Sequence, residues 1–321
     1  MSDWRPSATQ AALIQRAQAL ATIRGFFAER GVLEVETPIL SPSANPDPAI
    51  QPPHLAADLD GIGGWYLNSS PELAMKRLLA ASSGAIYQLC KVFRGGERGR
   101  WHHPEFTLLE WYRPGWMLDE LIDEVADLIR CVLKQPTLAV QRIGYRALFI
   151  DHLGLDPWHC AVDQLQTLAM AHRIGGADSL QLNVDGWLDL LLSHCLQPDL
   201  GRGCITVIAD YPPSQAALAQ LRHGEVTTAA RFECYVEGLE LANGYHELAD
   251  WQQQRQRFLA DLAQRKHAGE QQMPMDEHFF QALAHGLPDS VGVALGVDRL
   301  IALALGAQTI DQVVAFTIER A

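Results

Sequence analysis

Residues 86–112 read IYQLCKVFRGGERGRWHHPEFTLLEWY. Two apolar, aromatic-rich runs, 86–94 and 106–112, stand on either side of a connection that is rich in Gly, Arg and His. Runs of this composition, bounded by turn-forming residues, predict β-strands, and the polar connection predicts that they form a hairpin. We therefore expect a largely antiparallel sheet rather than the strict alternation of strands and helices that builds a parallel one.

Residues 231–248, RFECYVEGLELANGYHEL, predict a second hairpin with its turn at Glu237-Gly238. With that turn Tyr235 pairs with Glu240, so Glu233 and Glu240 project from one face of the hairpin. Simple alternation gives the opposite face to three further polar or aromatic residues, Asn243, Tyr245 and Glu247. A site shared by both groups would require a β-bulge near Gly244.

The remaining segments supply helices and further strands. Apolar residues recur at three- and four-residue steps over 8–30, which predicts an amphipathic helix ended by Gly31, and 32–38 predicts a strand. Strands are also expected at 204–211 and 291–295, and helices at 252–267 and about 298–305. Residues 118–200 are mostly helical in pattern and predict a helical insertion. The expected fold is α+β, a single domain over 1–321 with an antiparallel sheet flanked by helices.

Composition bounds the possible functions. The 321 residues carry a formal net charge of -13, so no broad basic surface is available for a nucleic-acid backbone, and a tRNA partner is not expected. The six cysteines form no CxxC pair, which disfavours a structural zinc site. The first residues do not resemble a signal peptide, and no apolar run is long enough to span a membrane. A cytoplasmic location is expected.

Two segments could bind phosphate groups. Arg94 ends the first strand of the opening hairpin and Phe106 begins the second, an arrangement that can clamp a phosphate and stack a purine. Residues 292–300, GVALGVDRL, end a strand in glycine and put Arg299 in the first turn of a helix, which favours anions. The chain lacks the Gly-rich nucleotide-binding fingerprints, so arginines and a metal ion would hold the phosphates. A solvated turn explains the first segment equally well.

Several carboxylates could bind cations, and each has an alternative interpretation. Glu233 and Glu240 suit a divalent cation, or simply form a solvated acidic face. Glu110 lies within an apolar strand, where a charge needs either a cationic ligand or a structural Arg or Lys partner. Glu72 follows Ser69 at capping-box spacing and could serve only to begin a helix.

The order of these segments resembles the three motifs of class II aminoacyl-tRNA synthetases. The motifs match Gly31 to Pro38, Phe93 to Phe106 and Gly292 to Leu300. The stretches SPELAMKRL (70–78), PEFTLLE (104–110) and ELANGYHEL (240–248) are similar to lysyl-tRNA synthetase in particular. The likeness extends to the paralogues of that synthetase that act on translation elongation factor P, because YPPSQAALAQ (211–220) and Ala294, where the synthetase has glycine, fit those paralogues.

The resemblance implies a ligase that activates (R)-β-lysine or lysine with ATP and Mg²⁺ and transfers it to a lysine ε-amine of elongation factor P. It implies a homodimer without an anticodon-binding OB domain. Arg94 and Arg299 would be catalytic, with ATP held by Arg94, His102, Phe106, Glu233, Glu240 and Arg299. Glu233 and Glu240 would bind the metal. The amino-acid pocket would contain Ser70, Glu72, Glu110, Tyr112, Asn243, Tyr245, Glu247 and Ala294.

One residue departs from the family pattern. The second motif of the family has a glutamate two residues after its arginine, but here that position is Gly96 and a glutamate follows at Glu97. Two alternatives stand beside the ligase, and Gly96 supports only the second of them. One is a minimal synthetase that charges a tRNA or a carrier protein with lysine, and the other is a non-catalytic, amino-acid-sensing regulatory paralogue.

Overall fold

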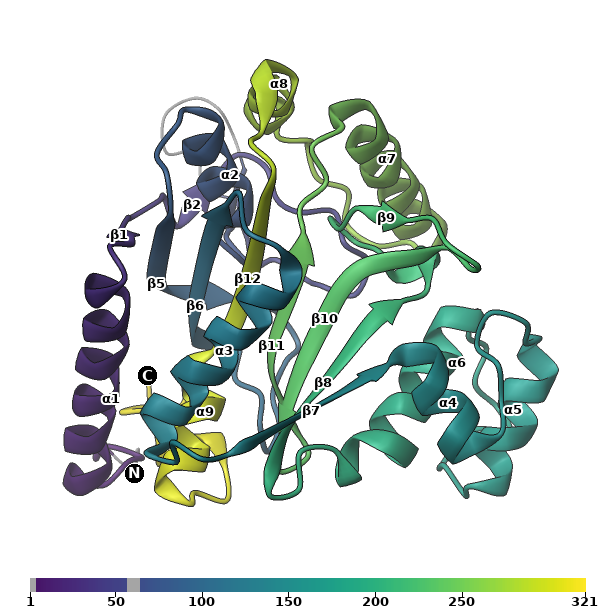
Figure 1. Ribbon diagram of the computed structural model, residues 1–321, viewed down its shortest axis with the longest axis horizontal. Helices are drawn as coiled ribbons and strands as arrows, with labels where there is room; N and C mark the ends of the chain where they lie inside the picture. The colour runs from purple at the N-terminus through teal and green to yellow at the C-terminus, as the bar shows by residue number, and fades with distance from the viewer. Residues whose placement is uncertain (1–3, 57–63) are drawn as a thin grey trace. The chain divides into compact units, whose positions relative to one another are not determined.

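The computed structural model describes residues 4–56 and 64–321, which fall into two compact units. Unit 1 comprises Met1–Pro136 and Glu247–Ala321, and unit 2 comprises Thr137–His246. In Figure 1, unit 1 runs from purple to blue and again from green to yellow, and unit 2 is teal to green.

The sheet of unit 1 has the strand order β1-β5-β6-β12. The strands are β1 (Leu33–Glu34), β5 (Ile86–Phe93), β6 (Glu105–Pro114) and β12 (Ser290–Gly296). The predicted hairpin is confirmed, since β5 and β6 pair antiparallel, and β12 pairs antiparallel with β6. The strand expected at 32–38 is shorter, because only Leu33–Glu34 runs in register along the edge of β5. A small second sheet contains β2 (Leu40–Ser41), β4 (Trp65–Leu67) and β3 (His54–Leu55).

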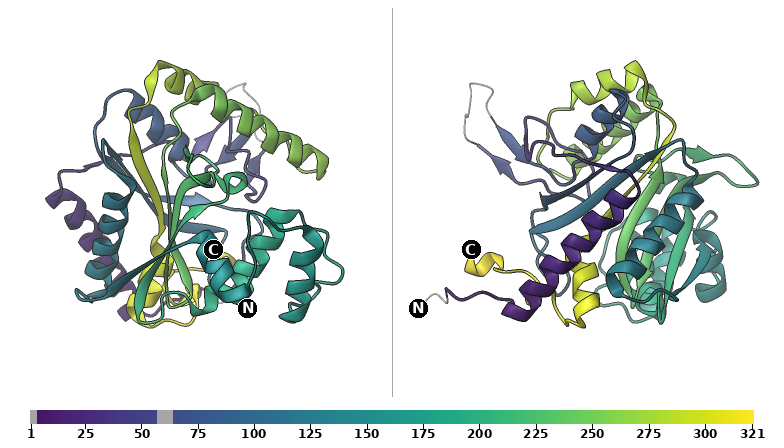
Figure 2. Two further views of the ribbon diagram at one scale, coloured as in Figure 1. Left: turned by 45° about the vertical axis from the view of Figure 1, so that its right-hand side comes forward. Right: turned by 60° about the vertical axis from the view of Figure 1, so that its left-hand side comes forward.

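Helices pack on unit 1 in two groups. The first contains α1 (Gln10–Glu29), α3 (Leu118–Leu133) and α9 (Val297–Leu305), which contact one another and the strands β6 and β12 (Figures 1 and 2). The predicted end of α1 is confirmed, since Gly31 adopts φ +65° directly after the helix. The second group contains α2 (Glu72–Ala80), α7 (Trp251–His267) and α8 (Glu277–Gly286).

Unit 2 has the strand order β11-β10-β8-β7, with β9 (Leu221–Arg222) beside β10. The strands are β7 (Ala139–Gly144), β8 (Cys204–Tyr211), β10 (Thr228–Val236) and β11 (Leu239–His246). Its helices α4 (Tyr145–Leu153), α5 (Val162–Ala171) and α6 (Val184–Leu191) share one apolar core around the buried Phe149, Leu165 and Trp187. The stretch 118–200 is thus mostly helical as expected, but it also contains β7. That strand was missed because it is largely exposed and lacks apolar alternation.

Short helical turns complete the chain: η1 (Leu192–Leu196), η2 (Gln197–Asp199), η3 (Pro213–Gln215), η4 (Ile310–Gln312) and η5 (Ile318–Arg320). The α+β class with a mostly antiparallel sheet is confirmed. Over residues 4–56 and 64–321, the structure has no helix both long and apolar enough to cross a membrane.

The proline-rich segment 41–53 is anchored rather than loose. Arg265 of α7 is fully buried and donates hydrogen bonds to the carbonyls of Asp47 and Ile50 at 2.9 and 3.0 Å. Gly95 donates its N–H to the carbonyl of Gln51 at 2.6 Å. The segment is therefore fixed both to α7 and to the connection between β5 and β6.

Candidate active site

A buried carboxylate, Glu110, lies in the middle of β6. Its side chain is 3% exposed, and its two oxygens accept hydrogen bonds from the Tyr112 hydroxyl at 2.5 Å and the Ser70 hydroxyl at 2.7 Å. No Arg or Lys among the described residues lies within ion-pair distance of it, although the nearby Lys76 charge acts to lower the pKa of Glu110. Glu110 therefore accepts hydrogen bonds from two neutral donors, and the remaining lone pairs of its carboxylate oxygens can accept hydrogen bonds from a cation.

Two more carboxylates share a buried lysine. The Lys76 ammonium, 1% exposed, lies 2.7 Å from Glu72 Oε1 and 2.6 Å from Glu247 Oε2. The capping-box interpretation of Glu72 is wrong, because its carboxylate bonds to Lys76 and α2 begins without a side-chain cap. The Ser70 hydroxyl instead accepts the N–H of Glu72 at 3.0 Å.

Burial makes the Glu110 and Glu247 carboxyl groups hard to ionise. Desolvation, followed by the nearby Glu72 charge, raises the pKa of Glu110 to about 7. Desolvation likewise raises the pKa of Glu247 to about 8, although the Lys76 ammonium opposes the shift. A ligand that brings positive charge would stabilise both groups in their ionised forms.

Strand register brings further residues to the same cluster. Ala294 of β12 lies directly opposite Glu110, and Gly292 lies opposite Tyr112. A Cβ atom at Gly292 would come within 2.4 Å of Glu247 Oε1 and of the Tyr112 ring. The backbone at Gly292 therefore forms the wall against which both side chains pack, and the methyl group of Ala294 lies on the same face.

Gln88 of β5 is a residue that the sequence analysis did not identify. It is 2% exposed, lies opposite Glu110 on the other side of β6, and its Oε1 has no hydrogen-bond donor among the described residues. A buried acceptor without a donor is costly unless a ligand completes it. Gln88 therefore adds a neutral acceptor beside the Glu110 carboxylate.

The connection between β5 and β6 carries the predicted phosphate ligands. The Arg94 guanidinium lies over the Phe106 ring at 5.1 Å, and the Arg94 Nε is buried without an acceptor among the described residues. An arginine N–H that is buried and unpaired fits a phosphate oxygen. Glu97, the glutamate next to the departing Gly96, lies 3.9 Å from Arg94 Nη1.

His102 and Arg299 also meet at this connection. Arg299 Nη2 lies 2.7 Å from His102 Nε2, and Arg299 Nε donates to the carbonyl of Trp101 at 3.2 Å. Burial, and then the Arg299 guanidinium, lowers the pKa of His102. The ring is therefore neutral at pH 7 and its Nε2 accepts from Arg299.

In unit 2 the predicted register of the second hairpin is confirmed. The turn at Glu237-Gly238 has φ of +51° and +76°, and Tyr235 lies opposite Glu240. The predicted bulge exists but lies at Leu241 rather than near Gly244, because Cys234 pairs with Ala242 while Tyr235 pairs with Glu240. The extra residue brings Asn243 opposite Glu233, so these two share a face.

Two donors orient the Glu233 carboxylate. One of its oxygens accepts a hydrogen bond from Arg231 and the other from the Tyr235 hydroxyl. Arg231 also donates to Asn243 Oδ1 at 3.3 Å and lies over the Tyr211 ring at 4.4 Å. Each Glu233 oxygen retains a lone pair, so the carboxylate can still bind a cation.

The candidate metal ligands do not form a dedicated cage. Across the described residues, no group of three or more His, Cys, Asp or Glu side chains is placed to hold a metal ion. Magnesium commonly needs only one or two carboxylates, because water and substrate phosphates complete its shell. Glu233 and Glu240, on one face of the hairpin, fit that requirement.

Lys76 and Arg231 were also missed as functional residues. Lys76 stands four residues after Glu72, the spacing of a helical ion pair, and this signal could have been used. Its second partner, Glu247, is distant in sequence and could not have been found without the fold. Arg231 precedes Glu233 by two residues and so shares its face of the strand.

Comparison with known proteins agrees with this geometry. The family model "tRNA synthetases class II (D, K and N)" matches residues 1–320, and the chain belongs to this family of ATP-dependent ligases. The chain is 45% identical over 324 residues to the "Elongation factor P--(R)-beta-lysine ligase" of Edwardsiella ictaluri, covering all of this chain and 99% of that protein. It is also 45% identical over 332 residues to the protein of the same name from Erwinia tasmaniensis, covering the whole of both. The predicted class II ligase is confirmed.

Proposed function

We propose that the chain activates (R)-β-lysine, or lysine, with ATP and transfers the aminoacyl group to a lysine ε-amine of elongation factor P. The observation that carries the proposal is the buried Glu110, whose two hydrogen-bond donors are both neutral, which has no Arg or Lys of the described residues within ion-pair distance, and which lies beside the Gln88 Oε1 that lacks a donor among them. The names of the two relatives agree with this substrate pair.

The charge of the cluster suits a diamino acid. Three carboxylates, Glu72, Glu110 and Glu247, face one ammonium, Lys76, so the ionised cluster has two negative charges in excess. A diamino acid has two ammonium groups that balance them, and its own carboxylate remains for the reaction. Buried charges that lack this balance are expensive, so a substrate with a single ammonium group would bind more weakly.

Side chains rather than a glycine-rich loop would hold ATP. Arg94 would bind the α-phosphate through its unpaired Nε, Phe106 would stack on adenine, and His102 with Arg299 would meet the outer phosphates. Glu233 and Glu240 would bind Mg²⁺, which neutralises the phosphate charge when it is present. Ser70 and Tyr112 would bind the amino acid, and Asn243 and Tyr245 are proposed as further ligands of it.

The reaction has two displacements. In the first, a carboxylate oxygen of the amino acid attacks the α-phosphorus, the bond to the β-phosphate oxygen breaks, and diphosphate leaves. In the second, the neutral ε-amine of the acceptor lysine attacks the acyl carbon, AMP leaves, and the nitrogen loses a proton as the amide forms. Arg94 and Arg299 would stabilise the charge that develops on the phosphate oxygens, which makes them the catalytic residues.

Two properties of the whole protein accompany this proposal. The chain would form a homodimer through α1, which buries only Ile23, Phe26 and Phe27 of its 20 residues and leaves Ile14 52% exposed. It would act in the cytoplasm, where its acceptor, a translation factor, is located. A tRNA acceptor is disfavoured by the net charge of -13.

The proposal is tested by ATP–diphosphate exchange with (R)-β-lysine, α-lysine and the other amino acids in parallel, followed by mass spectrometry of elongation factor P. Exchange that is strongest with (R)-β-lysine, with a matching mass gain on the factor, supports the proposal. Exchange with α-lysine and no modified factor would instead indicate a minimal synthetase. Absence of exchange would indicate a regulatory paralogue.

A further inference from the structure

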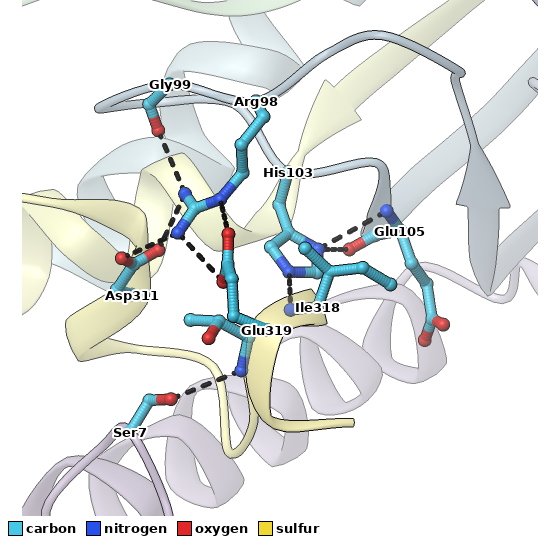
Figure 3. Close-up of polar contacts among 9 residues, drawn as sticks. Ser7, Arg98, Gly99, His103, Glu105, Asp311, Ile318 and Glu319 are labelled. Carbon is cyan, nitrogen blue, oxygen red and sulfur yellow. Dashed lines mark hydrogen bonds and ion pairs between the residues drawn. The ribbon is translucent and has the colours of Figure 1, made fainter. Parts of the chain in front are cut away.

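The connection between β5 and β6, residues 94–104, is attached to the C-terminal segment 308–320. Arg98 is the main attachment (Figure 3). Its guanidinium contacts Asp311 Oδ1 and Oδ2 at 3.0 Å each, and Glu319 Oε1 and Oε2 at 2.6 and 3.2 Å. The guanidinium group of Arg98 thus joins two carboxylates of the C-terminal segment to the connection. Each carboxylate receives two parallel hydrogen bonds, the geometry that guanidinium groups favour.

His103 forms a second attachment at the other end of the connection. Its ring is buried, and Nε2 accepts the backbone N–H of Ile318 at 2.8 Å (Figure 3). Because Nε2 accepts, the proton of the neutral ring lies on Nδ1, which donates to the carbonyl of Glu105 at 2.6 Å. The imidazole therefore links the start of β6 to η5.

Arg100 supplies a third attachment. Its Nε donates to the carbonyl of Gln308 at 2.8 Å, and its own carbonyl accepts the N–H of Ile310 at 2.9 Å. All three attachments reach the same short segment, which contains η4 and η5.

The C-terminal segment is itself fixed to the residues before α1. Ser7 donates its N–H to the carbonyl of Ala315 at 2.7 Å, and its hydroxyl accepts the N–H of Thr317 at 3.2 Å (Figure 3). Arg320 donates to the carbonyls of Arg5 and Pro6 at 3.0 and 3.2 Å. The segment is held from both sides and can transmit rigidity to the connection.

The connection needs such support because of its composition. Gly95, Gly96 and Gly99 give it more backbone freedom than any other residue type would, and ordering that backbone costs entropy. It nevertheless carries Arg94 and His102, whose positions must be fixed if they are to bind phosphate groups. Arg98 already has two carboxylate partners, so it does not need a phosphate to satisfy its charge.

We propose that residues 308–320 form a brace that holds the connection in its ATP-binding conformation, with Arg98 and His103 as positioning residues. The inference rests on the proposed assignment of Arg94 and His102 to ATP. It assigns to Asp311 and Glu319, which lie outside the three class II motifs, an effect on ATP affinity that is exerted through Arg98.

The test compares Arg98→Gln, Arg98→Lys and the double variant Asp311→Asn/Glu319→Gln with the wild-type chain. Exposed ion pairs are worth little singly, so loss of both should raise the KM for ATP roughly two- to thirtyfold. Arg98→Lys should lie between, since an ammonium cannot form the fork. The KM for the amino acid should stay unchanged. Hydrogen exchange of the amides of 94–104 should become faster in the same variants.

Arg255→Gln is the matched control, because Arg255 forms an equally exposed two-bond pair with Glu277 on α7 and α8, at 2.9 Å for both bonds. It should change neither the KM for ATP nor the exchange of 94–104. If Arg98→Gln leaves both quantities unchanged, the brace is refuted. If Arg98→Gln raises the KM while the double carboxylate variant does not, Arg98 is itself an ATP ligand and the brace is again refuted.

Arg94→Ala separates this inference from the proposed function. If that variant retains the wild-type KM for ATP, the assignment of the connection to ATP fails, whatever the brace does. Hydrogen exchange of 94–104 without ATP tests the brace on its own, since it requires no nucleotide. Faster exchange in Arg98→Gln together with loss of ATP affinity in Arg94→Ala is the result expected if both are right.

Discussion

Glu110 differs from the other buried carboxylates of unit 1 because its hydrogen-bond donors are both neutral. Replacing it with glutamine keeps the shape but removes the charge that a substrate ammonium would meet. A hydrogen bond to a charged group contributes about 1.5–3 kcal/mol, so Glu110→Gln should raise the KM for (R)-β-lysine roughly ten- to hundredfold. The KM for ATP should not change, and steady-state exchange kinetics measure both.

Glu105→Gln serves as the control for that variant, since Glu105 starts the same strand but its side chain is 44% exposed and, among the described residues, its carboxylate pairs only with Lys91 at 3.5 Å. It should leave the KM for the amino acid unchanged. An equal effect of both substitutions would show that general electrostatics, not a contact at Glu110, attracts the substrate.

The raised pKa of Glu110, about 7, predicts a pH dependence of binding. Below pH 7 the empty protein holds a proton on Glu110 that an ammonium ligand must displace, so affinity should rise as pH increases through 7 and then level off. Tyr112, Ser70, Gln88, Glu72 and Lys76 surround this carboxylate, and Glu247 shifts in the same direction. Calorimetric titration from pH 6 to 8 measures the slope, which should flatten in Glu110→Gln.

The same shift has the opposite sign for folding. A carboxyl whose pKa is raised on folding binds more protons in the folded state, so the free energy of unfolding falls as pH rises from about 4.5 to about 7. Urea unfolding across that window should show a shallower decline in Glu110→Gln than in the wild-type chain. A steeper decline would contradict the buried environment of Glu110.

Ala294 lies opposite Glu110 and would give the proposed pocket a methyl group at the position where the family resemblance places a glycine in lysyl-tRNA synthetase. One methyl group changes discrimination by about 1–3 kcal/mol. Ala294→Gly should therefore shift the ratio of kcat/KM toward α-lysine by roughly tenfold, while activity with ATP persists. Exchange kinetics with both amino acids measure the ratio, and an unchanged ratio would remove Ala294 from the specificity residues.

At the scale of elements, the packing of the β10–β11 hairpin depends on one glycine outside it. Gly201 has φ +71°, and a Cβ atom there would lie 2.5 Å from the Tyr235 carbonyl oxygen. Gly203 has a similar φ of +66° but open space around it. Gly201→Ala should thus cost the left-handed penalty of about 1–2 kcal/mol plus about 1–3 kcal/mol of overpacking.

Gly203→Ala should cost only the left-handed backbone penalty of about 1–2 kcal/mol, because no atoms crowd that position. Denaturant unfolding of both variants therefore isolates the close approach of the backbone to β10. Equal losses of stability would show that backbone conformation, not contact with Tyr235, explains the glycine at 201.

The sequence predicted elements wherever local signals agreed with the tertiary structure. The turn at Glu237-Gly238 fixed the pairing of Tyr235 with Glu240, because a two-residue hairpin leaves little freedom of register. The bulge was predicted near Gly244 but lies at Leu241. An extra residue anywhere between Glu240 and Asn243 would bring these two side chains to the same face, so alternation alone does not fix its position. Strand β7 is exposed and pairs in parallel with the distant β8, so no local pattern marked it.

Site residues divide in the same way. Arg94 and Glu110 could be proposed as site residues from the resemblance to the class II motifs, but the side chains that contact such residues could not be predicted. The contacts of Lys76 with Glu247 and of Arg98 with Glu319 join residues 171 and 221 positions apart in the chain (247 − 76 and 319 − 98). Contacts of that span depend on the fold and leave no signal in a single sequence.

At the scale of the whole molecule, the exposed apolar side chains of α1 and β1 predict self-association. Ile14 is 52% and Leu33 57% exposed, and burying such side chains is worth about 1.5–3 kcal/mol each. The double variant Ile14→Lys/Leu33→Lys should dissociate the proposed dimer, as sedimentation velocity would measure. Leu259→Lys on α7, at a comparably exposed leucine, should leave association intact. A monomeric wild-type chain would refute the proposed dimer.

Gly292 and Ala294 both belong to β12, but the two positions differ in which side chains they can accommodate. Any side chain at 292 would collide with Glu247 and Tyr112, so every substitution there would disrupt the buried carboxylate cluster. Position 294 is partly exposed and tolerates at least a methyl group. A descendant of this protein that changed its substrate while keeping this fold could therefore vary position 294 but not position 292. In a duplicated gene, a single codon change at position 294 could alter the substrate without first abolishing function.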